Sequence, residues 1–178
     1  MSSNGIVTHA AEAPVITRAD GEALRHIWPW LRSKLEIVKH KALVSQRRQG
    51  LTRSYATWIP EHIRVAIIRG LANPPQNTVE LWLVNSQVAR ADGFFITSCP
   101  FDEFIQVQLT LFIWIGYSER AGLLEKCEPF VDRLALDRGC IQIEHVSGRM
   151  AGWMKRQASC GNGRVWRLSQ MTFRKELQ

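Results

Sequence analysis

Residues 104–146 read FIQVQLTLFIWIGYSERAGLLEKCEPFVDRLALDRGCIQIEHV, and this stretch decides the fold class. Apolar residues at every second position predict a long strand from Phe104 to Ile115. An apolar stripe spaced by three and four predicts a helix that Ser118 caps and Gly139 ends. A second strand, Ile141 to Val146, follows at once. A strand, a helix and a second strand in this order predict a parallel crossover unit.

The long strand also predicts its own place in a sheet. Six apolar residues share one face: Ile105, Val107, Leu109, Leu111, Ile113 and Ile115. The other face is polar at Gln106 and Gln108, but apolar at Phe112 and Trp114. The second half is therefore expected to be buried on both faces, as in a central strand closed by Gly116.

Two helices are expected before this unit. Asp20 can cap the first, whose apolar face falls on Leu24, Ile27, Trp28, Leu31, Leu35, Val38 and Ala42. Pro29 should kink or split that helix, and residues 46–53 read as a polar connector. A second helix begins near Pro60 and is expected to stop at Gly70.

Between the second helix and the long strand, the period of the apolar residues changes to two. Val79, Leu81 and Leu83 predict one strand, and residues 88–97 predict another, with a bulge expected at Gly93. Residues 85–87 read as the turn between them. An antiparallel meander therefore precedes the crossover unit.

The ends of the chain complete the predicted order of elements. Residues 1–13 read as a loose arm, and residues 14–17 as a short extended piece. Ser147 can cap a short fourth helix that ends near Gly161, and a last strand runs over 165–175. The prediction is a single α/β (α+β layered) domain over 14–178. It holds a mixed sheet of about six strands and about four helices.

Composition restricts the class of protein. The chain has 178 residues, 46% of them hydrophobic and 22% charged, which is typical of a globular domain. It has no apolar run long enough to cross a membrane and no secretory start, so neither a membrane span nor secretion by a signal peptide is expected.

The formal net charge is +7, with the basic excess at the two ends of the chain. That excess suits an acidic partner such as nucleic acid, but the basic residues are scattered along the chain, which favours a solvated surface.

Cysteine and histidine spacing argues against a metal site. The cysteines are Cys99, Cys127, Cys140 and Cys160, and no two stand in a C-x-x-C pair. His26, His40 and His62 lack partners at ligand spacing. His145, which follows Glu144, can be read as a general base or as a core histidine. Thiols in a reducing compartment are the expected state of the cysteines.

The order of the elements resembles the GNAT-type N-acetyltransferase fold. Two segments narrow the resemblance: Ser147 to Trp153 reads S-x-R-x-x-G-W after a strand, and Leu111 to Tyr117 reads L-x-x-W-x-x-Y. Both are similar to GNAT-like proteins of tailed phages, including virion-associated proteins of short-tailed phages. The resemblance implies that acyl-CoA lies where the long strand parts from the next one. Its pyrophosphate would rest on backbone N–H groups at the start of the following helix.

Three departures from the GNAT pattern favour a protein without acetyltransferase activity. The family's phosphate loop reads R/Q-x-x-G-x-G/A, whereas Tyr117 to Gly122 places Arg120 at the first small position and Glu119 beside the anion. The family's acid is a Tyr on the helix after the fifth strand, and residues 147–159 contain none. The family's Glu base has no clear match in Glu103 or Glu144.

The candidate site residues follow from these segments, and each has a plainer alternative. Ser118, Arg120 and Gly122 are read as a residual cofactor-binding anion site, or as a helix cap, an exposed Arg and a packing Gly. Arg149 and Trp153 are read as partner-binding residues, or as a local stack on the sheet. Trp30 is read as a partner contact, or as packing for the next segment. No catalytic residue is assigned.

The functional hypothesis is a structural or accessory phage protein in the virion or host cytoplasm. Its partners would be other virion proteins or further copies of the chain, with non-specific contact to DNA through the basic ends, and no cofactor is expected. The alternative hypothesis is an acyl-CoA-dependent N-acetyltransferase, whose cofactor would be acetyl-CoA.

Overall fold

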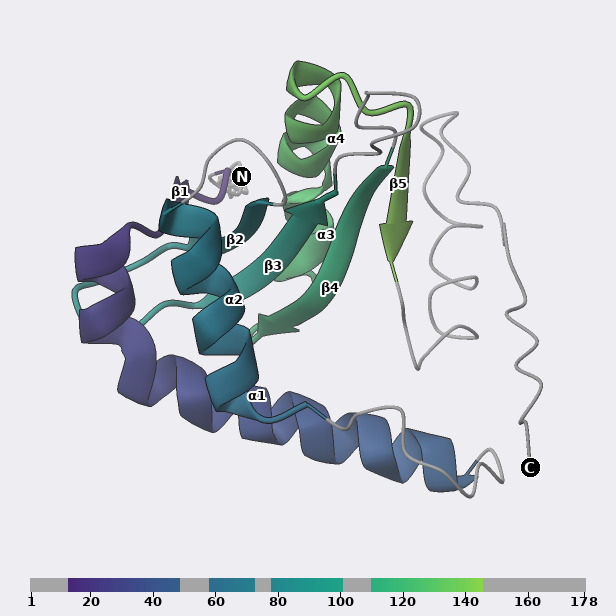
Figure 1. The fold of residues 1–178 in the computed structure, drawn as a ribbon. Coiled ribbons are helices and arrows are strands. Elements are labelled where there is room, and N and C mark those ends of the chain that lie inside the picture. Colours follow the sequence, from purple (N-terminus) through teal and green to yellow (C-terminus); the bar gives the residue numbers. More distant parts are fainter. Residues whose placement is uncertain (1–12, 49–57, 73–77, 101–109, 146–178) are drawn as a thin grey trace, which may run out of the picture. The chain divides into compact units, whose positions relative to one another are not determined.

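The computed structural model describes residues 13–48, 58–72, 78–100 and 110–145 (Figure 1). All of these residues belong to a compact unit that spans 1–146, and residues 147–178 form a second unit. The predicted fourth helix and last strand, with Arg149 and Trp153, lie in that second unit and outside the described residues. The single domain over 14–178 therefore stays a prediction.

The described residues form one mixed sheet of five strands in the order β1-β2-β3-β4-β5. The strands are β1 (Ile16–Arg18), β2 (Thr78–Val84), β3 (Gly93–Cys99), β4 (Thr110–Ser118) and β5 (Gln142–His145). Neighbours from β1 to β4 pair antiparallel, and β5 pairs parallel to β4. The predicted meander and parallel crossover are both confirmed.

Helices cover the two faces of this sheet (Figure 1). They are α1 (Gly21–Arg48), α2 (Pro60–Ala72), α3 (Leu123–Lys126) and α4 (Glu128–Asp137). Helices α1 and α2 share an apolar core with one face of β2 and β3, and α3 and α4 share a second core with the opposite face. The mixed α+β fold class is thereby confirmed. None of the helices in the described ranges combines the length and apolar character that a membrane span needs.

Helix α1 begins as the sequence predicts. The Oδ1 atom of Asp20 accepts hydrogen bonds from the N–H groups of Glu22 (3.0 Å) and Ala23 (2.8 Å). Its apolar stripe is buried at Leu24, Ile27, Leu31 and Leu35. Pro29 lies inside the helix, and Figure 1 shows the ribbon of α1 bending in its first turns without a break. The helix runs on to Arg48, so residues 46–48 of the predicted connector are helical, and the rest of it lies outside the described residues.

The predicted end of α2 at Gly70 is wrong. The helix continues to Ala72, and Gly70 is buried inside it. A Cβ atom at this position would collide with the backbone O of Val79 and would lie 2.8 Å from its N. Gly70 is therefore needed because α2 packs directly against the backbone of β2.

Strand β3 begins later than predicted and takes the central place in the sheet. The sequence predicts a strand from Val88, but Val88 is 80% exposed and lies in the turn that Gln87 and Arg90 close by an isolated bridge. The strand starts at Gly93, and each of its seven residues is buried.

A β-bulge in β4 overturns the predicted burial of that strand. Ile113 pairs with Thr97 and Ile115 pairs with Ile96, so Trp114 is an extra residue on β4. The bulge reverses the faces of the strand: Leu111 and Ile113 lie in the core under α3 and α4, whereas Ile115 and Tyr117 lie in the core under α1 and α2. Trp114 is 41% exposed. The second half of β4 is therefore not buried on both faces.

The predicted third helix is also corrected. Strand β4 continues past Gly116 to Ser118, so Ser118 ends a strand and does not cap a helix. The helical region consists of two pieces, α3 and α4, that meet at Cys127. Its predicted end is confirmed, since Gly139 follows α4 with φ of 70°.

Candidate functional site

The candidate site lies at the end of β4, where this strand runs beyond its pairing with β5. The parallel register joins Thr110 through Ile113 to Gln142 through His145, and β5 ends there in the described chain. Figure 1 shows β4 turning away from β5 past this segment. Residues 114–118, which we call the β4 extension, still run along β3 on their other side: Ile115 through Ser118 pair with it, and Trp114 is the bulged residue.

The chain that leaves the β4 extension makes a tight exposed turn. Residues Ser118 to Gly122, which we call the β4–α3 loop, close when the Oγ of Ser118 donates to the backbone O of Arg120 at 2.8 Å. Gly122 precedes α3 with φ of 77°, in the left-handed region that favours glycine. A Cβ there would meet nothing within 4 Å, so this conformation explains the glycine and packing does not.

Glu119 in this loop is held by two cations from other elements. Its Oε1 lies 2.9 Å from the Nζ of Lys34 on α1, and its Oε2 lies 2.9 Å from Nη2 of Arg90 in the β2–β3 turn. The hydrogen bond from Lys34 lowers the pKa of Glu119, and the same bond raises the pKa of Lys34. Both groups are therefore charged near neutral pH.

Arg120 also faces an acidic group. Its Nη2 lies 3.4 Å from Oδ2 of Asp92, and Asp92 accepts a hydrogen bond from Nδ2 of Asn85 at 3.1 Å. The backbone of Asp92 adds a further tie, because its O accepts the N–H of Glu119 at 2.9 Å. The loop is thus fixed to the β2–β3 turn by backbone and side-chain contacts, while the Arg120 side chain stays 70% exposed.

Aromatic rings lie beside this network. Tyr117 and Phe94 stack with centroids 5.8 Å apart, and Trp30 meets Phe94 edge-on at 5.9 Å. The Nζ of Lys34 lies 5.5 Å from the ring centroid of Tyr117 and 5.9 Å from that of Trp30. Trp30 packs against the core under α1 and α2, so its packing role is seen, and its predicted role as a partner contact stays a prediction.

The structure brings the predicted residues Ser118, Arg120 and Gly122 together in one loop. Sequence reasoning missed the residues that fix this loop: Lys34, Arg90 and Asp92. The charges of the loop were the available signal, because Glu119 needs a cationic partner and Arg120 an anionic one. Nothing in the sequence alone selects Lys34 and Arg90 from the other basic residues.

The candidate base residues are placed only in part. Glu144 lies on β5 opposite Phe112 and its Oε1 accepts a hydrogen bond from Nε2 of Gln142 at 3.2 Å. The backbone of His145 pairs with that of Ile113. Glu103 lies outside the described residues.

Solved structures of acetyltransferases are similar to this chain in fold. A probable acetyltransferase matches with a TM-score of 0.54 and 14% identity, covering 92% of this chain and 99% of the other. AAC(6')-Iy in complex with the bisubstrate analogue CoA-S-monomethyl-acetylneamine matches with a TM-score of 0.55 and 15% identity, covering 93% and 100%. The fold is GNAT-like.

A further structural match agrees on the GNAT-like fold, and the sequence comparisons found no match. A possible acetyltransferase from Clostridium difficile 630 matches with a TM-score of 0.51 and 10% identity, covering 94% of this chain and 99% of the other. No protein-family model matches the chain, and no curated protein matches it in sequence. At these identities the likeness establishes the fold, and none of these matches supports the predicted phage or virion role.

Proposed function

We propose that the protein is an acyl-CoA-dependent N-acetyltransferase. The observation that carries the proposal is the β4 extension, which turns away from β5 in Figure 1 and leads into the β4–α3 loop. In the GNAT fold this is where acyl-CoA lies between the two strands. Because a fold by itself hosts many functions, the proposal depends on the chemistry of the loop.

The loop is compatible with an anionic ligand despite Glu119. The carboxylate is paired with Lys34 and Arg90, so its charge is compensated within the protein. In the described chain the N–H groups of Ala121 and Gly122 donate to no protein acceptor, and both residues are exposed. Exposed amides beside a cationic Arg120 are groups that bind phosphate oxygens in proteins.

Calorimetry with acetyl-CoA and with CoA tests the proposal on the full chain. We expect saturable binding with a dissociation constant in the micromolar range, competition between the two ligands, and acetyl transfer when a panel of amines is added. Absence of binding at millimolar acetyl-CoA would overturn it.

A matched pair of glycine variants tests the position of the ligand. Gly122 and Gly139 both have positive φ, and a Cβ at either meets nothing within 4 Å. Gly122→Val adds a side chain to the loop and should weaken acetyl-CoA binding about tenfold or more, a loss of about 1.4 kcal/mol. Gly139→Val carries similar backbone strain after α4 and should leave the affinity unchanged.

A second candidate is an accessory protein without acetyltransferase activity, in a virion or elsewhere in an infected cell. It is favoured by Glu119 and Arg120, which stand where the family's phosphate loop carries small residues. This candidate predicts no acetyl-CoA binding and co-purification with phage particles or with further copies of the chain. Any contact with DNA would be non-specific and would weaken steeply as salt is added.

A further inference from the structure

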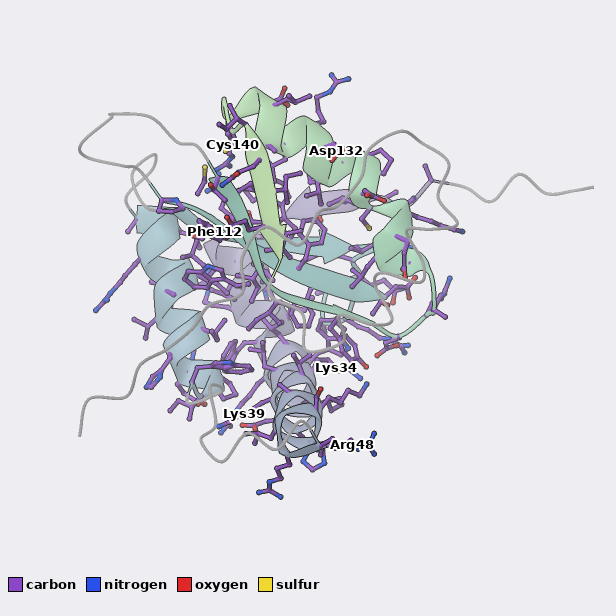
Figure 2. The ribbon with its side chains drawn as sticks, turned by 90° about the vertical axis from the view of Figure 1, so that its right-hand side faces the viewer. Lys34, Lys39, Arg48, Phe112, Asp132 and Cys140 are labelled. Carbon is purple, nitrogen blue, oxygen red and sulfur yellow. The ribbon has the colours of Figure 1, made fainter. Side chains whose placement is uncertain are left out.

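Two cysteines from different elements meet in the core on the α3 and α4 side of the sheet. Cys99 is the last residue of β3, and Cys140, which Figure 2 labels, lies between α4 and β5. Their Sγ atoms are 3.1 Å apart, and the residues are 0% and 5% exposed. Both are thiols in this structure.

The sheet register explains why these residues meet. Ser98 pairs with Phe112 and Thr110 pairs with Gln142, so the end of β3 and the start of β5 flank the start of β4. The turn after α4 then fixes Cys140, whose N–H donates to the backbone O of Ala135 at 2.9 Å. The two thiols are therefore held in place by backbone contacts of the sheet and the crossover.

We propose that Cys99 and Cys140 form an intramolecular disulfide when the protein meets a peroxide. One thiolate attacks hydrogen peroxide to give a sulfenic acid and hydroxide. The second thiol then attacks that sulfur, the new S–S bond forms, and water leaves. In total two thiols lose two protons and two electrons, and one peroxide takes them up to become two waters. The sulfur atoms must approach by about 1 Å to reach a disulfide bond of about 2.05 Å.

The cross-link would join β3 to the α4–β5 crossover at the start of β4. A disulfide stabilises chiefly by restricting the unfolded chain, so the oxidised form should be the more stable one. The β4–α3 loop follows the other end of β4, so the pair does not depend on the proposed acetyltransferase function. Burial raises the pKa of Cys99 to about 12, and we therefore expect slow oxidation at neutral pH.

Cys127 supplies a matched control in the same core. It is 1% exposed, and burial raises its pKa to about 11. Its Sγ donates to the backbone O of Leu123 at 3.3 Å. All three thiols are thus buried, but the close contact between two sulfur atoms is between Cys99 and Cys140.

The test is a peptide map of the folded full chain after reduction, removal of reductant, treatment with hydrogen peroxide and alkylation. We expect a cross-linked peptide that joins Cys99 to Cys140 and has lost two hydrogens. The melting temperature should rise by several degrees and return on reduction. Cys127→Ser and Cys160→Ser should keep the cross-link and the shift, whereas Cys99→Ser and Cys140→Ser should lose both.

The wild-type map decides the question even where a variant fails to fold. Oxidation in denaturant provides the comparison, because an unfolded chain should give mixed pairings among its four cysteines. The proposal is supported if Cys99 pairs selectively with Cys140 in the folded protein and this selectivity is lost in denaturant. The proposal would be overturned if Cys99 and Cys140 stay reduced in the folded protein after prolonged peroxide treatment. Sulfinic acid at these positions without a cross-link, or a cross-link that uses Cys127 or Cys160, would also overturn it.

Discussion

Lys34 on α1 and Glu119 in the β4–α3 loop form an ion pair with 2.9 Å between Nζ and Oε1. The pair ties a helix on one face of the sheet to the loop that leaves the end of β4. Arg90 completes the clamp from the β2–β3 turn. Three segments far apart in the sequence thus share one carboxylate.

The first prediction concerns the pH dependence of this carboxylate. The pKa of Glu119 is lowered in the folded protein, so its contribution to stability is present above the pKa of an unfolded glutamate and is lost as pH falls through the folded pKa. Glu119→Gln should lower the melting temperature at pH 7, and the difference from the parent should vanish under acid conditions. Thermal melts from pH 7 to pH 2 measure it, with the exposed Glu36→Gln as control. A constant difference at every pH would contradict the assignment.

Lys34 should matter for its ring contacts as well as for its charge. Lys34→Met removes the ion pair and the cation–π contacts with Tyr117 and Trp30, each of which is worth about 0.5–1 kcal/mol at exposed sites. We expect this variant to melt below Glu119→Gln, and Lys34→Arg to recover most of the loss. Denaturant unfolding of the three variants measures the order. Equal stability of Lys34→Met and Glu119→Gln would show that the rings add nothing.

Glu80 should be among the most sensitive polar positions. It is 2% exposed, and its carboxylate lies 3.0 Å from Nε of Arg18 and 2.6 Å from Nη2 of Arg138. Breaking a buried pair leaves an uncompensated charge, so Glu80→Gln should cost about 3–5 kcal/mol. Adding Arg138→Met should recover part of this loss.

A surface pair provides the comparison for Glu80. Glu61 lies 3.1 Å from Nε of Arg32, and both side chains are about half exposed. Glu61→Gln should cost less than about 1 kcal/mol. Denaturant unfolding measures both free energies, and similar losses for the two glutamates would contradict the buried role of Glu80.

The contact between α2 and β2 gives a steric prediction. Gly70→Ala places a Cβ against the backbone of Val79, which cannot turn away as a side chain can. We expect a loss of about 1–3 kcal/mol or more from overpacking. Gly21→Ala is the control, because a Cβ there meets nothing within 4 Å. If both variants unfold at the same denaturant concentration, α2 does not pack this closely.

Local patterns in the sequence predicted several elements correctly. The Asp20 cap, the buried stripe of α1 and the alternation in β2 appear as expected, and the parallel return from β4 to β5 follows from a helix between two strands. These features depend on residues close in sequence, where period and capping chemistry act directly. The predictions at Arg149 and Trp153 lie outside the described residues and stay predictions.

The wrong predictions from the sequence share one cause, which is contact between segments that are distant in the sequence. Gly70 reads as a helix stop by local propensity, but close approach of β2 explains it. Val88 reads as strand, but the turn before β3 leaves it exposed. Ser118 reads as a helix cap, but pairing with Gly93 keeps it in β4.

The sequence by itself determined the order of strands and helices from β1 to β5, because apolar period and turn residues are local properties. Only the tertiary structure decided how the candidate site is built. The bulge at Trp114 depends on the pairing of β3 with β4, and it reverses which residues of β4 face each core. The partners of Glu119 depend on where α1 and the β2–β3 turn come to lie. An ion pair forms only between groups a few ångströms apart in space. The sequence therefore shows which residues are charged, and the fold determines which of them pair.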